Sequence, residues 1–319
     1  MDQPSGPPNH KKHLHNSLER EEGHYGADQG NTSGAGEMNS ENFDASRIMN
    51  RPTHRRARLL AVANQKGGVG KTTTAINLAT ALCAVGQKVL LMDLDPQGNA
   101  TTGLGVRRSM ISTSSYDVLF EEANVVEAAV QTKVPRLSVV PSSIHLSGAE
   151  IELVTAENRE YRLKNALRQD LPYDYVILDC PPSLNLLTLN ALVAVDSVVV
   201  PLQCEFYALE GLSHLVKTIE RVQKSFNPSL EIQGIVLTMF DKRNRLSVQV
   251  ENDVREHFGE TVYKTVIPRN VRLSEAPSFG LPAIVYDMRS TGAQAYITLA
   301  REVIKREKEI ARIAAEKAA

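Results

Sequence analysis

The segment from Ala61 to Thr74, AVANQKGGVGKTTT, limits the possible folds more than any other part of the chain. Leu59 to Ala63 is apolar and predicts a buried strand, and a glycine-rich turn separates it from a predicted helix over Thr73 to Val85. A strand, a glycine turn and a helix in this order provide the context that a phosphate-binding loop needs. Backbone N–H groups of the turn and the positive end of the helix then attract an anion. We therefore expect Lys71 to reach the β- and γ-phosphates of a nucleotide and the Thr72 hydroxyl to bind magnesium.

The loop departs from the common G-x-x-x-x-G-K-[ST] pattern in one respect. Gln65 stands at the first glycine position, and Lys66 follows as a second lysine. Lys66 and Lys71 bracket one anion-binding turn, which a plain turn with solvated lysines explains poorly.

The composition narrows the classes of protein that this chain can belong to. Hydrophobic residues make up 42% of the 319, which is ample for a core. The formal net charge of −1 does not indicate a nucleic-acid-binding protein, so any contact with DNA must come from a local patch. Cys83, Cys180 and Cys204 lack C-x-x-C spacing, which favours a reduced cytosolic protein over a disulfide scaffold, a zinc site or an iron–sulfur carrier. No apolar run reaches the roughly 18 residues of a membrane span, and no secretory signal is visible, so we expect a cytoplasmic protein without a membrane partner.

Residues 1–57 differ in composition from the rest of the chain. They are rich in Gly, Ser, Asn, Pro, His and charged residues, and they show no apolar periodicity. Such a segment buries too little surface to offset its ordering entropy, so we predict a disordered tail at 1–57 and one folded domain at 58–319. The basic end of the tail, Arg51 to Arg58, is either a contact for DNA or acidic lipid or a solvated linker.

From Arg58 onward, apolar β-branched segments alternate with segments of helical periodicity. This alternation predicts an α/β fold, a mostly parallel twisted sheet flanked by helices on both faces, with ligands at the carboxyl ends of the strands. Further strands are expected at Lys88–Met92, Leu137–Val140, Tyr175–Leu178, Ser197–Val200, Ile232–Met239 and Tyr263–Ile267, and helices at Gly148–Val154, Arg159–Gln169, Ala208–Ser225, Ser247–Phe258 and Gly292–Lys317. Ile284–Tyr286 is expected to be an eighth strand or an extended loop.

Two strand ends carry carboxylates that suit phosphoryl transfer. Asp95 follows the strand Lys88–Met92 on a glycine-containing loop, where it can position the attacking water or the water shell of a metal. Asp93 competes for this role, although it is closer to the strand and can be structural. Asp179 follows the apolar strand Tyr175–Leu178 in the Walker B pattern, in which the carboxylate holds magnesium, often through water.

Five motifs in series resemble the ParA/Soj family of bacterial chromosome-partitioning ATPases. They are Lys66–Thr74 in the form of the deviant Walker A motif, Asp93–Asn99, Asp179–Ser183, Gln203–Gly211 and Val266–Pro277. Their order and spacing match the family through most of Arg58 to Ala300, whereas the preceding tail is not part of the resemblance. A lone phosphate loop is common, but five such motifs in series are highly specific.

The resemblance implies a P-loop ATPase that works in a cycle. In the family, ATP with Mg²⁺ closes two monomers into a sandwich dimer, the dimer binds DNA without sequence preference on the nucleoid, and a ParB-type centromere-binding protein stimulates hydrolysis. Lys66 is similar to the lysine that reaches the ATP of the partner protomer, Lys71 to the phosphate lysine and Asp95 to the catalytic carboxylate. The implied nucleotide-binding residues are Lys66, Gly67, Gly68, Val69, Gly70, Lys71, Thr72, Thr73, Pro268 and Asn270, and the implied magnesium site comprises Thr72, Asp95 and Asp179. The cargo is a chromosome or a plasmid.

Basic residues near the sixth and seventh predicted strands are candidate DNA contacts. From charge alone, a solvated basic loop explains Lys242, Arg243, Arg245, Arg269 and Arg272 as well as a DNA-binding stripe does. The resemblance places the family's DNA surface in this region and favours Arg243 and Arg272, whereas Arg245 departs from the family pattern and either strengthens the patch or is incidental.

Two other functions remain open from the sequence. A MinD-like membrane ATPase shares the loop and the dimer, but Tyr296–Ala319 carries many charges and no Phe or Trp, which is more typical of a helix packed on the domain than of a membrane anchor. A metabolic phosphotransferase or ligase can use the same fold, but no second set of polar residues suited to a small acceptor is evident.

Overall fold

The computed structural model describes residues 56–318, so the predicted tail at 1–57 lies almost entirely outside the described residues. The described chain contains a seven-stranded sheet with the order β3-β4-β2-β5-β1-β6-β7. Strand β3 pairs antiparallel with β4, and the other strands pair in parallel. The strands are β1 (Arg58–Val62), β2 (Val89–Asp93), β3 (Val130–Gln131), β4 (Leu137–Val140), β5 (Tyr175–Asp179), β6 (Ser197–Gln203) and β7 (Glu231–Thr238).

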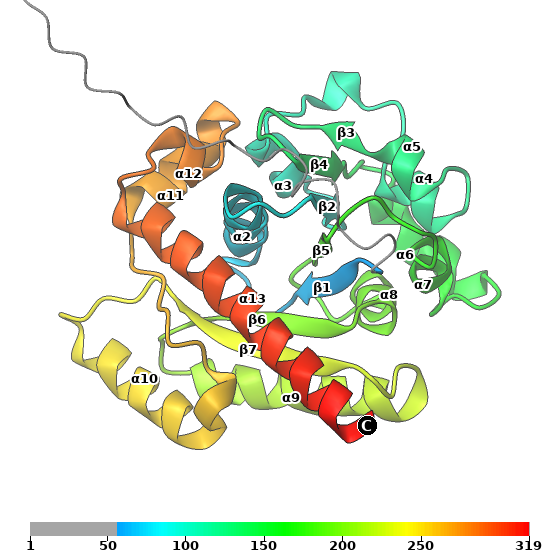
Figure 1. Ribbon diagram of the computed structural model, residues 1–319. Coiled ribbons are helices and arrows are strands. Elements are labelled where there is room, and N and C mark those ends of the chain that lie inside the picture. Colours follow the sequence, from blue (N-terminus) through cyan, green and yellow to red (C-terminus); the bar gives the residue numbers. More distant parts are fainter. Residues whose placement is uncertain (1–55, 319) are drawn as a thin grey trace, which may run out of the picture. The chain divides into compact units, whose positions relative to one another are not determined.

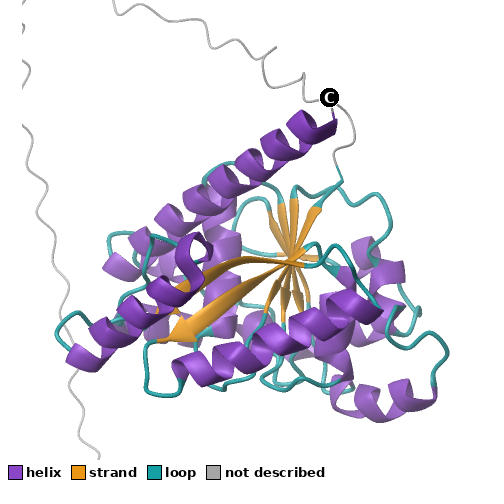
Figure 2. Ribbon diagram, turned by 90° about the horizontal axis from the view of Figure 1, so that it is seen from below, coloured by secondary structure: helices purple, strands orange, loops and turns teal. Residues whose placement is uncertain are grey.

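Helices cover both faces of the sheet (Figure 1, Figure 2). On one face, α2 packs with the long C-terminal helix α13, and on the other α8 packs with α9. The predicted α/β fold class is therefore confirmed. The helices are α2 (Lys71–Ala84), α3 (Asn99–Gly103), α4 (Ser115–Leu119), α5 (Val125–Ala128), α6 (Leu146–Thr155), α7 (Arg162–Ala166), α8 (Leu186–Ala194), α9 (Ala208–Ser225), α10 (Arg245–Phe258), α11 (Val271–Glu275), α12 (Ala283–Tyr286) and α13 (Thr291–Ala318).

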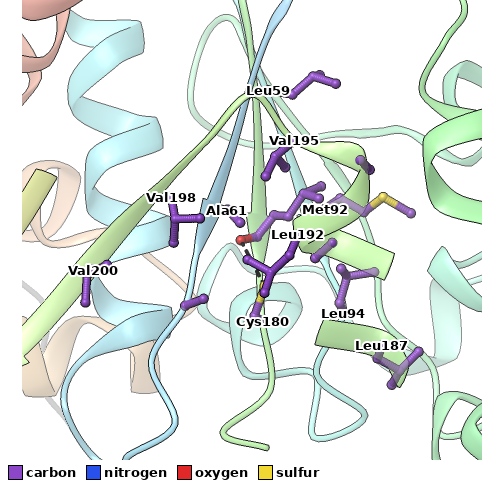
Figure 3. Close-up of a cluster of buried hydrophobic side chains, with 14 of the residues drawn as sticks. Leu59, Ala61, Met92, Leu94, Cys180, Leu187, Leu192, Val195, Val198 and Val200 are labelled. Carbon is purple, nitrogen blue, oxygen red and sulfur yellow. Dashed lines mark hydrogen bonds between the residues drawn. The ribbon is translucent and has the colours of Figure 1, made fainter. Parts of the chain in front are cut away.

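The central strands are buried on both faces, as a parallel sheet between two helical layers requires. In β1, Leu60 and Val62 contribute to the core under α2 and α13, whereas Leu59 and Ala61 contribute to the opposite core. Figure 3 shows part of this second core, where Leu192 of α8 lies among side chains of the sheet. Because each apolar run serves two cores, these strands read as continuous hydrophobic segments rather than as an alternating pattern.

The predicted strand Tyr263–Ile267 is wrong. This segment touches β7 at its two ends, where the N–H of Tyr263 donates to the Ile235 carbonyl oxygen at 2.9 Å and the N–H of Ile267 donates to that of Leu237 at 2.8 Å. The flanking residues Val262 and Pro268 form only isolated bridges. The Glu302 carboxylate of α13 accepts hydrogen bonds from the backbone N–H groups of Lys264 and Thr265, at 2.7 and 3.0 Å. The middle of the segment thus bonds to a side chain of α13, so no continuous ladder with β7 forms.

The segment Ile284–Tyr286 is neither a strand nor an extended loop. It forms the short helix α12, which starts directly after Pro282. Proline has a fixed backbone angle that suits a helix start and lacks the N–H group that a helix leaves unpaired there. Helix α8, which we did not predict, is apolar almost all round because both sides are buried, so it shows little amphipathic periodicity.

Three neighbouring strands end at the same edge of the sheet. In the register of β1, β5 and β2, Asp179 lies beside Val62 on one side and beside Asp93 on the other. The loop after β1 and the carboxylates of the other two strands are therefore brought together, as expected for a parallel sheet. Across residues 56–318, none of the helices is both long and apolar enough to cross a membrane.

Candidate nucleotide-binding site

The loop between β1 and α2 depends on glycine at several positions. Gly68 and Gly70 have φ angles of 76° and 86°, a conformation that side chains disfavour. A Cβ atom at Gly67 or Gly68 would meet nothing within 4 Å, so this part of the loop faces open space. Helix α2 begins at Lys71, and its N-cap, Gly70, supplies no side-chain hydrogen bond. The N–H groups of the first turn therefore remain available for a phosphate.

The two lysines of the loop occupy different positions. Lys71 is buried, and its Nζ donates to the carbonyl oxygen of Lys66 at 2.9 Å. Burial lowers the pKa of Lys71, an effect that the nearby Asp179 carboxylate partly opposes. Lys66 pairs with Glu205, which follows β6, at 2.6 Å, and its side chain is 37% exposed. Lys71 thus lies inside the loop, whereas Lys66 lies at its rim.

Asp179 has the features of a metal-binding carboxylate. Its side chain is fully buried, and neither carboxylate oxygen has a hydrogen-bond partner in the described structure. Burial raises the pKa of Asp179 well above its ordinary value, and the Asp93 carboxylate raises it further, whereas the Lys71 ammonium group lowers it. An unpaired buried carboxylate is costly, and a bound metal ion removes that cost. These residues therefore fit a magnesium ion next to the phosphate loop.

The structure distinguishes Asp93 from Asp95. Asp93 Oδ2 accepts hydrogen bonds from the backbone N–H and the hydroxyl of Thr101, at 2.8 and 2.7 Å. Burial raises the pKa of Asp93 to about 6, although these bonds from Thr101 act in the opposite direction. Asp95 uses one carboxylate oxygen, Oδ1, to accept the Gln97 N–H at 2.9 Å. Asp93 therefore holds the loop together, and this favours Asp95 as the carboxylate that faces a ligand.

A cavity of about 320 Å³ continues from the phosphate loop between α2 and the segment that follows β7. Pro268 and Asn270, which the family resemblance implies as nucleotide-binding residues, are among the residues that line it. The Asn270 amide is already engaged, because its Nδ2 donates to Thr291 Oγ1 and its Oδ1 caps α11 at the N–H of Arg272. The size and position of the cavity suit a nucleotide base. Further lining residues that the sequence analysis missed include Thr238, Met239, Leu273 and Tyr296.

The candidate DNA contacts lie where β7 ends. The bridge between Phe240 and Pro268 brings two chain segments side by side, and Arg243 and Arg269 line one hollow between them. Arg245 is exposed at the first position of α10. Two of the predicted contacts are partly neutralised, since Arg243 pairs with Asp241 at 2.8 Å and Arg272 pairs with Glu275 and Asp287 at 2.9 and 3.3 Å.

The sheet order, the phosphate loop at a helix N-terminus and the buried Walker B carboxylate define a P-loop nucleotide hydrolase with an additional lysine at the rim of the loop. A family model described as an AAA domain matches residues 57–232.

Known proteins identify the family. The chromosome partitioning protein ParA of Caulobacter vibrioides is 63% identical over 255 residues, which cover 79% of this chain and 96% of that protein. The sporulation initiation inhibitor protein Soj of Bacillus subtilis is 56% identical, with 77% and 98% covered. Among solved structures, the cobyrinic acid a,c-diamide synthase of Mycobacterium smegmatis with bound ADP and magnesium has a TM-score of 0.70 and 40% identity, over 79% of this chain and 96% of that one. The chain belongs to the ParA/Soj family of chromosome-partitioning ATPases.

Proposed function

We propose that this ATPase is a nucleotide-dependent switch for DNA partitioning. ATP with Mg²⁺ closes two copies of the chain into a dimer, and the dimer binds DNA without sequence preference on the nucleoid. A ParB-type partner then stimulates hydrolysis, and the dimer releases the DNA.

The position of Lys66 carries this proposal. An ordinary phosphate loop needs one lysine, and Lys71 occupies that place inside the loop. Lys66 lies at the rim, half exposed, and its pair with Glu205 is also half exposed. Such a surface pair contributes about 0–1 kcal/mol, so Lys66 exchanges it readily for the more concentrated negative charge of a partner's triphosphate. Because that charge is present only with ATP, dimer formation follows the nucleotide state.

The residues of each protomer have separate tasks in the hydrolysis. Lys71 and the N–H groups of the loop bind the β- and γ-phosphates, and Thr72 and Asp179 hold Mg²⁺. When bound, Mg²⁺ supplies positive charge that neutralises the phosphate oxygens. Asp95 orients the attacking water, and Lys66 of the partner protomer offsets the charge of the transition state in place of an arginine finger.

Sedimentation of the purified full-length chain tests the switch. With Mg²⁺ and a non-hydrolysable ATP analogue, the chain is expected to sediment as a dimer. With ADP it is expected to sediment as a monomer. A monomer in both nucleotide states, with normal turnover, would contradict the proposal.

Arg243, just before α10, and Arg272 of α11 are expected to contribute to DNA affinity by contacting phosphate groups of the DNA. Arg243→Glu and Arg272→Glu should each weaken binding to all DNA sequences to the same extent and lower the salt dependence, the slope of log K against log salt, by about 1 per lost contact. ATP-dependent dimers should remain, because neither residue lies in the phosphate loop. Filter binding to DNA over a salt series measures both quantities.

Arg168→Glu is the matched control, since it removes an exposed arginine beyond α7, away from the α10 and α11 segments. If Arg243→Glu and Arg272→Glu bind DNA as this control does, the DNA surface lies elsewhere.

A further inference from the structure

Helix α6 carries apolar side chains on its outer as well as its inner side. Leu146, Ala149 and Leu153 are fully buried, which accounts for the packing of this helix on the domain. A second set of apolar side chains lies on the outer side at helical spacing. Ile144 belongs to this set although it precedes α6, because the hydrogen bond from the Ser147 N–H to the Ile144 carbonyl oxygen continues the helical turn. This outer set consists of Ile144, Ile151 and Val154, which are 66%, 78% and 57% exposed. We call these three residues, together with Glu150 and Glu152, the α6 face.

The α6 face is negatively charged. On the helical wheel, Glu150 and Glu152 flank the apolar stripe on its two sides, and the ten residues Leu146–Thr155 include no lysine or arginine. The Tyr116 hydroxyl donates to Glu152 at 2.7 Å. This bond, together with burial and the carboxylates of Glu152 and Glu122, raises the pKa of Tyr116 to about 12.

One arginine of the loop before α7 reaches the end of the α6 face, and it is paired there with a carboxylate outside the face. Arg159 pairs with Glu160 at 2.9 Å and donates to the carbonyl oxygen of Val154 at 2.9 Å. Arg162 lies 3.7 Å from Glu121, another carboxylate of this region.

The charge of the α6 face discriminates among possible occupants. DNA and an anionic membrane surface carry the same sign of charge and are repelled. A second copy of the chain that pairs through the same helix places glutamates against glutamates, which is unfavourable. A cationic amphipathic segment fits both parts of the face, because its apolar residues cover Ile151 and Val154 while its basic residues meet Glu150 and Glu152.

The face also lies close to the loop that carries Asp95. Ser142, two residues before Ile144, donates from its hydroxyl to the carbonyl oxygen of Asp95 at 2.6 Å. Its own N–H donates to Thr101 Oγ1 at 2.9 Å, and Thr101 in turn holds Asp93. A ligand that contacts Ile144 therefore acts on the chain segment that positions Asp95.

The α6 face and the candidate DNA contacts belong to opposite edges of the sheet. Helix α6 follows β4, near one end of the strand order, and α10 follows β7, at the other end (Figure 1). One protein can therefore bind α6 while DNA occupies the α10 side.

We propose that the α6 face is the docking surface for a cationic amphipathic segment of the protein partner that stimulates hydrolysis. This inference rests on the proposed switch function, but its central claim concerns the surface itself.

Fluorescence anisotropy with a labelled helical peptide of leucines and lysines, compared with its leucine–glutamate counterpart, tests the docking surface directly. The full-length chain is expected to bind the lysine peptide, more weakly at high salt, and not the glutamate peptide. The double variant I151Q/V154Q removes two apolar contacts without adding charge and should weaken binding by roughly tenfold. Glu150→Lys should weaken it as well, whereas Ile310→Gln, a matched change at a 42%-exposed isoleucine of α13, should not.

Equal binding of the two peptides, or unchanged binding by I151Q/V154Q, would overturn the proposal. A second experiment uses the ParB-type protein of the same genome. Its stimulation of ATP hydrolysis should be lost in I151Q/V154Q and kept in Ile310→Gln, while ATP-dependent dimers form in both. If that protein fails to stimulate the parent chain, the proposed function is wrong even though the peptide result stands. If it stimulates I151Q/V154Q as it does the parent, the α6 face is not its docking surface.

Discussion

Replacement of Asp95 by alanine is expected to lower the rate of ATP hydrolysis by roughly a hundredfold or more, because an unpositioned water loses the orientation that in-line attack requires. Nucleotide binding should persist, since Lys71, the glycines of the loop and Asp179 are unchanged. The variant should therefore accumulate as an ATP-bound dimer on DNA. Phosphate release and retention on immobilised DNA measure the two effects.

Asp95→Asn controls for a change in the shape of the loop. Asn retains an oxygen that can accept the Gln97 N–H, which Asp95 Oδ1 accepts at 2.9 Å, but it lacks the negative charge. If both variants are slow, the charge is required, whereas a slow Asp95→Ala with a normal Asp95→Asn indicates that loop structure is the cause. Normal turnover by both variants would refute the assignment of Asp95.

Replacement of Lys66 by alanine is expected to abolish ATP-dependent dimers at concentrations where the parent chain dimerises completely. Removal of one member of a desolvated charge pair at an interface costs about 2–5 kcal/mol, or roughly 30- to several-thousand-fold in affinity. Binding of ATP by the monomer should change little, because the Lys66 side chain pairs with Glu205 while Lys71 occupies the place of the phosphate lysine. Sedimentation with a slowly hydrolysed ATP analogue measures dimerisation, and a fluorescent nucleotide measures binding.

Lys217→Ala provides the control, since it removes an exposed lysine of α9 outside the phosphate loop. Dimers of Lys66→Ala that match those of this control would remove the trans-acting role. A Lys66→Ala chain that loses nucleotide binding as a monomer would show instead that Lys66 serves its own loop.

The sequence by itself determined the layout of this protein and the location of its phosphate loop. Both follow from local chemistry, because glycines at 68 and 70 permit left-handed backbone angles and continuous apolar runs predict strands buried on both faces. Asp179 could be identified in the same way, as a carboxylate at the end of an apolar strand. The family resemblance, which the comparisons confirm, also rests on such short motifs.

Only the tertiary structure decided which neighbours the polar side chains have. Lys66 and Glu205 are 139 residues apart in the chain, so no local pattern indicates their contact. Asp93 has a structural role because the Thr101 hydroxyl donates a hydrogen bond to its carboxylate. The segment Tyr263–Ile267 does not form a strand, and the Glu302 carboxylate of α13 accepts the hydrogen bond of the Lys264 N–H there. The same holds for the outer side of α6, because periodicity shows that a residue is apolar but not whether another element covers it. Local sequence specifies backbone conformation, whereas the packing of distant segments specifies burial, pairing and exposure.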